Sequence, residues 1–167
     1  MRKDAAALDT YSWDARVRAL YDYWLARCRD GCPPRRSDID PIDLPNLLRW
    51  LWLVDVTRDE PGWPLRFRAR LMGTEHVATM GHDPTGKWMD EVFPTFLTNP
   101  TYSDYVQVAE TGIPSYRAGT PLYHLDKEHV RMERVMLPLA GDGKNIDMIL
   151  AITVYMRGID IRQEDKP

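Results

Sequence analysis

The last apolar run of the chain, residues 146–156 with the sequence IDMILAITVYM, is the feature that most restricts the fold. Both alternating sets of positions in this run are apolar, apart from Asp147 and Thr153. A strand that is apolar on both faces is usually covered on both faces. The run therefore predicts a central strand that lies between the main core and a separate lid.

A helix near the N-terminus carries an apolar stripe that suits such a lid. Over residues 12–30, apolar side chains recur at spacings of three and four, the period of an amphipathic helix, and Ser12 is the expected N-cap. These side chains either cover the sheet or join two copies of the chain in a symmetric dimer, and the sequence leaves both roles open. The dimer or partner candidates are Trp13, Val17, Tyr21 and Trp24.

Four more runs have the composition and period of strands. Residues 49–57 are rich in Trp, Leu and Val, and residues 65–72 alternate between apolar and mostly arginine positions, so the two predict an antiparallel hairpin. Two further strands are expected over residues 115–124 and 130–139. The Asp142-Gly143 pair is a hairpin signal before the final strand.

Short helical segments separate the two blocks of strands. Thr74 can cap a helical turn that runs through Met80 and ends at Gly81, and residues 88–93 form another short piece. Asn99-Pro100 begins a longer helix that Gly112 is expected to end. Before the first strand, the Asp40-Pro41 pair predicts a further short helix. The order of elements is that of an α+β domain.

Three local motifs occur in this framework: the Asp40-Pro41 entry, the centre with Arg68, Arg70, Gly73 and Thr74, and the Asp142-Gly143 hairpin. Together they resemble a PAS-like family of small, mostly alphaproteobacterial proteins. The resemblance implies a five-stranded antiparallel sheet with helices on one face, preceded by the amphipathic helix. It implies a flexible tail at 1–11, a helix and linker at 12–36, the PAS-like domain at 37–156 and a second flexible tail at 157–167. The matching positions are Asp40, Pro41, Asp43, Pro45, Arg68, Arg70, Gly73, Thr74, Gly81, Asp83, Thr85, Gly86, Pro138, Leu139, Asp142 and Gly143.

Charge and cysteine content narrow the functional class. The formal net charge of −3 over 167 residues lacks the basic excess of a nucleic-acid-binding domain. No window has the length of a signal peptide or a membrane span, so we expect a cytoplasmic protein that does not contact membranes. Cys28 and Cys32 are then expected to be reduced. A structural zinc site needs about four ligands, and two thiols are too few to form one.

No recognisable frame for catalysis or metal binding occurs in the sequence. There is no nucleophile motif and no phosphate-cradling glycine loop. The histidines lack the helical spacing of a metal pair, so we expect plain exposed side chains and neither a metal site nor an enzyme. The histidines are His76, His82, His124 and His129.

In a PAS fold, the short helices, the longer helix and the late strands surround an internal pocket. Amphipathic tyrosines and adaptable methionines suit a small, mostly apolar pocket, although each also suits a packed core. Arg70 is the candidate for contact with an anionic group, although the arginine row can equally be a solvated face that pairs with acids such as Glu133. The other pocket candidates are Trp88, Tyr102, Tyr105, Tyr116, Met132, Met136 and Met148.

The resemblance and the missing catalytic motifs together predict a stand-alone sensory or regulatory domain. Such a domain binds a small molecule, a partner protein or both, and its expected partners are a second copy of the chain or a signalling protein. The sequence identifies no cofactor. Two alternatives stay open: an interaction domain with a filled core and no ligand, and an enzyme built on a PAS scaffold.

Overall fold

The computed structural model describes residues 8–58, 64–121 and 130–156, and over these residues the strands form one five-stranded sheet. Every neighbouring pair is antiparallel, and the order across the sheet is β2-β1-β5-β4-β3. The predicted α+β class and antiparallel sheet are confirmed. The strands are β1 (Leu51–Thr57), β2 (Arg66–Met72), β3 (Ser115–Gly119), β4 (Arg131–Leu139) and β5 (Met148–Met156).

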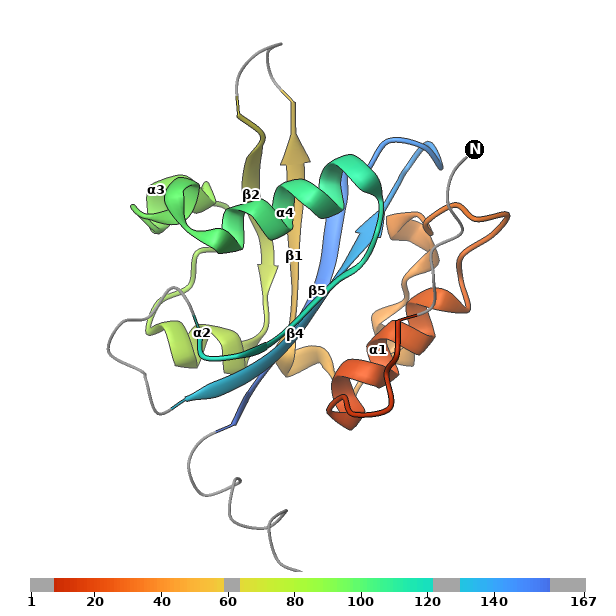
Figure 1. Cartoon of the computed structure of the whole chain (residues 1–167), viewed down its shortest axis with the longest axis horizontal. Coiled ribbons are helices and arrows are strands. Elements are labelled where there is room, and N and C mark those ends of the chain that lie inside the picture. The colour runs from red at the N-terminus through yellow and green to blue at the C-terminus, as the bar shows by residue number, and fades with distance from the viewer. Residues whose placement is uncertain (1–7, 59–63, 122–129, 157–167) are drawn as a thin grey trace, which may run out of the picture.

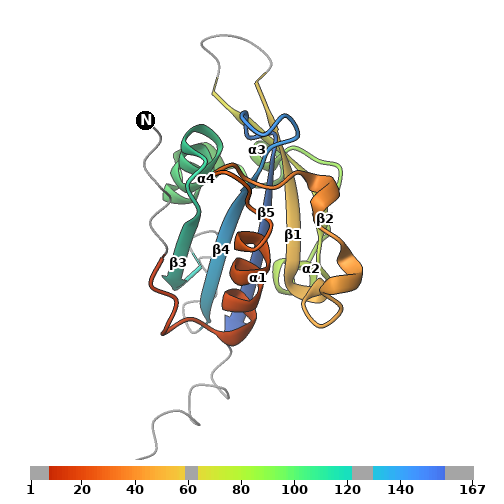
Figure 2. The same cartoon turned by 90° about the vertical axis from the view of Figure 1, so that its right-hand side faces the viewer.

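Helices cover both faces of this sheet. On one face lie α2 (Thr74–Met80), α3 (Met89–Val92) and α4 (Pro100–Thr111), and on the other lies α1 (Ala15–Leu25) (Figure 1). In the second view, α1 crosses in front of β4 and β5 (Figure 2). β5 is central in the sheet and buried along most of its length, as its two-sided apolar pattern predicts.

The N-terminal helix is shorter than predicted at both ends. Its N-cap is Asp14 and not Ser12, because the Asp14 carboxylate accepts a hydrogen bond from the Arg16 amide at 2.8 Å. The Asp14 amide is itself held by the Glu133 carboxylate at 2.7 Å. At the other end the helix stops at Leu25, and a tight reversal with Asp30 and Gly31 at positive φ follows a few residues later.

The predicted caps of α4 are confirmed, whereas Gly73 and not Thr74 is at the N-cap position of α2 and makes no side-chain cap bond. Asn99 accepts a hydrogen bond from the Thr101 amide at 2.9 Å, and Gly112, at a φ of 68°, ends α4 as expected. Before β1, the Asp40 carboxylate accepts a hydrogen bond from the Ile42 amide and caps the segment that follows it. The helix predicted there is only a 3₁₀ turn, Pro41–Asp43. A second 3₁₀ turn, Leu48–Trp50, leads directly into β1.

The apolar stripe of α1 covers the sheet of its own chain, which is the first of the two roles left open by the sequence. Trp13, Val17, Tyr21 and Trp24 are at most 7% exposed. The Trp13 ring stacks on Tyr116 at 4.1 Å between ring centroids, and the Trp24 indole donates a hydrogen bond to the Pro138 carbonyl at 2.9 Å. These side chains are therefore used inside the domain and do not form an exposed surface.

Several sequence predictions fall on residues that the structure does not describe. These are residues 1–7 of the expected N-terminal tail, the C-terminal tail at 157–167, most of the turn at 60–64 and the turn that contains His124 and His129.

Candidate ligand site

A small cavity lies between the sheet and the helices α2, α3 and α4. Its volume is about 30 Å³, which is close to the volume that one water molecule occupies in the liquid. Three strands contribute its sheet wall, with Trp52, Arg134 and Thr153. The helical side of the wall consists of His76, Met80, Met89, Phe93, Thr95, Phe96, Asn99, Thr101 and Tyr105.

Strand alternation brings the three sheet residues together. Arg134 on β4 lies directly opposite Thr153 on β5 in the antiparallel register. The Trp52 indole on β1 donates a hydrogen bond to the Thr153 hydroxyl at 2.9 Å. All three side chains point to the face that α2, α3 and α4 cover, so they form a polar strip across the centre of an otherwise apolar layer.

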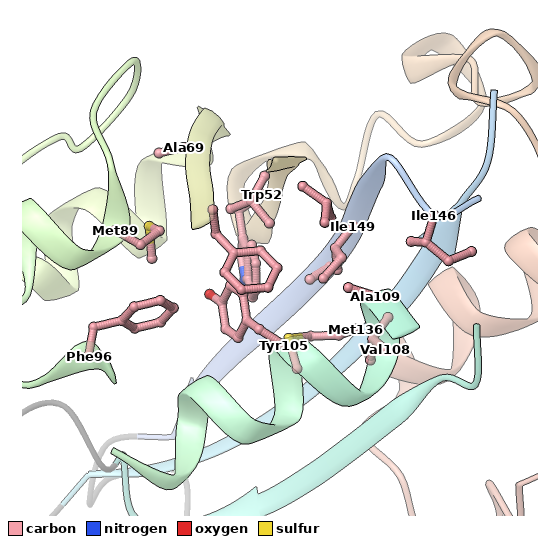
Figure 3. Close-up of a cluster of buried hydrophobic side chains, with 14 of the residues drawn as sticks. Trp52, Ala69, Met89, Phe96, Tyr105, Val108, Ala109, Met136, Ile146 and Ile149 are labelled. Atoms are coloured by element: carbon pink, nitrogen blue, oxygen red, sulfur yellow. The ribbon is translucent and has the colours of Figure 1, made fainter. Parts of the chain in front are cut away.

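Aromatic rings form the walls beside this strip. The Trp52 ring stacks with Tyr105 at 5.6 Å and with His76 at 5.9 Å between centroids. Figure 3 shows Trp52 and Tyr105 facing each other between the sheet and α4, with Phe96 and Met89 beside them. The cavity is thus lined by flat, rigid rings together with the flexible thioethers of Met80 and Met89.

The prediction that His76 is exposed is wrong, because α2 lies against the end of the sheet and turns this ring inward. His76 is only 6% exposed, and its Nδ1 lies 2.7 Å from the Tyr155 hydroxyl. His82 is exposed as predicted, with its ring 5.8 Å from that of Phe93.

Arg134 is the one buried arginine among the described residues, with a side chain that is 2% exposed. Its Nη2 donates a hydrogen bond to Asp104 Oδ2 on α4 at 2.6 Å. The same carboxylate accepts hydrogen bonds from Arg117 Nε at 2.8 Å and Arg117 Nη2 at 3.1 Å. The buried Nε of Arg134 has no hydrogen-bond partner. Two guanidinium groups therefore share one carboxylate at the edge of the cavity.

Of the eight pocket candidates named from the sequence, the structure places only Tyr105 on the cavity wall. Met132 and Met136 are buried on the same face of β4 as Arg134 but lie outside the wall. Tyr102 packs against Phe67 and Phe96 and donates its hydroxyl proton to a backbone carbonyl, and it also lies outside the wall.

The other four candidates lie away from the cavity. Arg70 is 65% exposed, and its Nη1 is 3.6 Å from the Asp55 carboxylate. Trp88 lies at the β2 edge, with the Arg66 guanidinium 4.2 Å from its ring centroid. Tyr116 and Met148 pack on the α1 face, because their strand positions have the opposite parity to the cavity residues.

The arginine row of β2 pairs with local groups and not with Glu133. Arg66 contacts Asp90 and Glu91, and Arg68 donates to the Gly86 carbonyl. Glu133 instead faces α1, where it contributes, after burial, to raising the pKa of Tyr116 to about 12. The row is thus an edge of paired charges, which is the simpler of its two predicted roles.

Cys28 and Cys32 are free thiols, and burial raises the pKa of Cys28 to about 11. Within the part of the chain that the structure describes, no three His, Cys, Asp or Glu side chains gather in a way that could hold a metal ion.

A larger, open groove lies on the other face of the sheet, between the segment that precedes β1 and the strands β1 and β2. Its volume is about 540 Å³ and its walls are mainly apolar. Leu48 and Leu71 are 43% and 44% exposed there, and Thr74 at the start of α2 borders it. The groove is wide and open to solvent, whereas the cavity is small and has a buried charge in its wall.

The comparison with known families agrees with this architecture. A family model described as a PAS domain matches residues 14–154. The chain belongs to the PAS domain family. This match covers every residue that borders the cavity, and it identifies the chain as a domain of a sensory and regulatory family whose members are generally signalling modules and not enzymes. No curated protein matches the chain. None of the described helices is long and apolar enough to span a membrane.

Proposed function

We propose that this PAS domain senses a small molecule in the cavity between its sheet and the helices α2, α3 and α4. The observation that carries the proposal is the convergence of Arg134, Thr153 and His76 on one mostly apolar cavity. Binding sites for small molecules are typically concave and apolar, with a few polar groups that fix the orientation of the ligand. The expected result of binding is a change in contact with a partner protein or with a second copy of the chain.

The cavity must widen to hold a ligand larger than a water molecule. Met80 and Met89 border it from the helical side, and methionine side chains are unbranched and adjust readily to a new shape. α3 has only four residues, and α2 has seven. A displacement of these short helices would enlarge the cavity without changing the sheet.

α2 is the element best placed to transmit such a displacement. His76 and Met80 border the cavity, whereas Thr74, at the first turn of the same helix, borders the apolar groove on the other face. Glu75 forms an ion pair with Arg49 on the groove wall at 2.5 Å. A ligand that moves α2 would therefore also alter the shape and charge of the groove, where a partner protein would find apolar surface.

A second candidate function is a ligand-free interaction domain that acts through the groove alone. The small volume of the cavity and the partial exposure of Leu48 and Leu71 favour this alternative. The two candidates differ in one simple respect, because only the first requires a small molecule to occupy the cavity.

Native mass spectrometry of the protein purified from its own cells distinguishes the two. The first candidate predicts a bound mass that is lost on denaturation and is absent from Thr101→Leu, a variant that fills the cavity from α4. The matched control, Leu150→Met on the α1 face, changes volume little and should retain the bound mass. No bound mass in the wild type, with no thermal shift from a metabolite library, would favour the ligand-free domain. A strict monomer at micromolar concentration in sedimentation analysis would remove the second copy from the proposal.

A further inference from the structure

We propose that Arg134 binds the carboxylate of a small monocarboxylic acid in this cavity, with the apolar body of the acid against Met80, Met89 and Phe96. The inference rests on the proposed function, since it names the class of ligand for the same site. Three properties of the described residues lead to it: an unpaired donor, a charge imbalance and the shape and polarity of the walls.

The unpaired donor is the Nε–H of Arg134. The side chain is 98% buried, borders the cavity, and binds Asp104 through Nη2 alone among its described contacts. The Nε atom is the only buried side-chain nitrogen or oxygen without a partner among the residues that the structure describes. Leaving a buried charged donor unpaired is costly, so a ligand that accepts from Nε gains binding free energy from a group that is already desolvated.

The charge imbalance indicates an anion and not a neutral acceptor. Arg134 and Arg117 both pair with Asp104, and among the described residues no other carboxylate forms an ion pair with either. The cluster therefore carries an excess of one positive charge, and its most buried member lies at the cavity. A water molecule would satisfy the Nε–H donor but would leave the charge without compensation.

The single excess charge also selects among anions. A monocarboxylate balances the cluster, whereas a phosphate dianion would reverse its sign inside an apolar layer. A carboxylate is planar and matches the planar guanidinium edge. The Trp52 and Tyr105 rings stack on each other at 5.6 Å between centroids, which is too close to admit a group between them, so both border the cavity beside the Arg134 guanidinium.

The rest of the wall suits an apolar body. Met80, Met89 and Phe96 are each at most 8% exposed and line the side of the cavity away from the sheet. Because the present volume is about 30 Å³, the ligand must be small or must displace these methionines. A short aliphatic or single-ring acid meets the charge requirement, and it fits once the methionines are displaced.

Isothermal titration calorimetry and thermal unfolding test the inference with defined probes at pH 7 and constant ionic strength. The probes are the sodium salts of acetate, butyrate and benzoate, with their neutral amides and sodium chloride as references. The inference predicts saturable binding of at least one carboxylate with a rise in Tm. No response is expected from the matching amide or from chloride. Arg134→Gln should weaken carboxylate binding by about tenfold or more, since it removes a charged donor.

Two further variants keep the test decisive if Arg134→Gln folds poorly. Arg134→Lys keeps the positive charge near Asp104 but removes the Nε donor, and it should also weaken binding. Arg70→Gln, which removes an exposed arginine of the same sheet, should leave the affinity unchanged.

Equal affinity in wild type and Arg134→Lys, or equal binding of an amide and its acid, would overturn the inference. No response to any carboxylate, with a neutral compound found by native mass spectrometry, would overturn it too and leave the proposed sensory function intact. No carboxylate response and no co-purified compound would remove both.

Discussion

The two faces of the sheet differ in the polarity of the side chains that are buried against them. On the α1 face, the buried side chains of the core are apolar or aromatic, and the Trp24 indole finds its partner in a backbone carbonyl. On the other face, α2, α3 and α4 cover an apolar layer that contains polar groups. All five buried polar side chains among the described residues belong to this second face: His76, Thr79, Thr101, Arg134 and Thr153.

This difference indicates that the two faces of the sheet have different roles. A layer that is apolar throughout gains stability from burial and needs no specific polar geometry. Buried polar groups stabilise less and must be satisfied, so their concentration around one cavity is better explained by binding than by stability. We therefore regard the packing of α1 on the sheet as structural and the opposite face as the one that carries the proposed ligand site.

The largest expected effect comes from truncating the lid. Trp24→Ala removes a side chain that is 3% exposed together with its hydrogen bond to the Pro138 carbonyl. We expect a loss of about 4 kcal/mol in the free energy of unfolding, measured by urea denaturation, because a large cavity remains. Trp24→Phe should lose clearly less. A loss below about 1 kcal/mol for Trp24→Ala would contradict a structural role for this face.

The buried charges of the opposite face should show strong coupling. Asp104→Asn leaves Arg134 buried without an anionic partner and should cost about 3 kcal/mol. Arg134→Met alone should cost less, because Asp104 retains its pair with Arg117. The double variant should recover most of the loss, since it removes the buried charge that Asp104→Asn alone leaves without an anionic partner. Simple additivity in this double-mutant cycle would show that the two residues are not coupled.

A smaller effect is expected for the hydroxyl at the centre of the polar strip. Thr153→Val removes the acceptor of the Trp52 indole without a large change in volume. The expected cost is about 1 to 2 kcal/mol, because a buried donor loses its partner. Thr98→Val is a suitable control, since that hydroxyl donates to a backbone carbonyl at an exposed position. Equal unfolding free energies for the two variants would argue against a buried polar strip.

The smallest effect should come from the turn before β5, outside both layers. Backbone amides of Asn145 and Lys144 donate to the Asp142 carboxylate and hold its pKa at about 2, below the usual 3.8. Since the pKa is lowered in the folded state, this stabilisation is full above pH 3.8 and is lost as the pH falls towards 2. Asp142→Ala should lower Tm slightly near pH 6, and the difference from wild type should vanish near pH 2. A constant difference across this range would contradict the assignment.

Much of the fold follows from local pattern, and much of the site does not. The alternation of residues 66–70, the Asn99 cap and the stop at Gly112 depend on neighbouring residues only, and each is confirmed. The predicted alternation fails at the end of this strand, where a register shift opposite Leu53 and Val54 leaves Leu71 exposed and Met72 buried. The burial of His76 depends on where α2 docks on the sheet. The positions of Tyr116 and Met148 depend on the parity of their strands relative to the central strand, which composition alone does not define.

Arg134 is a cavity residue that the sequence analysis did not name. It shares its strand parity with Met132 and Met136, two residues that the sequence already places at the pocket, so strict alternation puts its side chain on the inner face. The general tendency of arginine to lie at the surface concealed this signal. A charged residue at an inward strand position is therefore a useful indicator of a binding site.

The division between the two faces can be tested most directly with two indole groups of the protein itself. The Trp52 indole N–H lies at the cavity and the Trp24 indole N–H lies under α1, so each reports on one face in a nitrogen-15 NMR spectrum. Single Trp→Phe variants assign the signals, and sodium butyrate at fixed ionic strength is the probe. We expect the Trp52 signal to shift saturably while the Trp24 signal stays in place. A shift of the Trp24 signal without one at Trp52 would contradict the account.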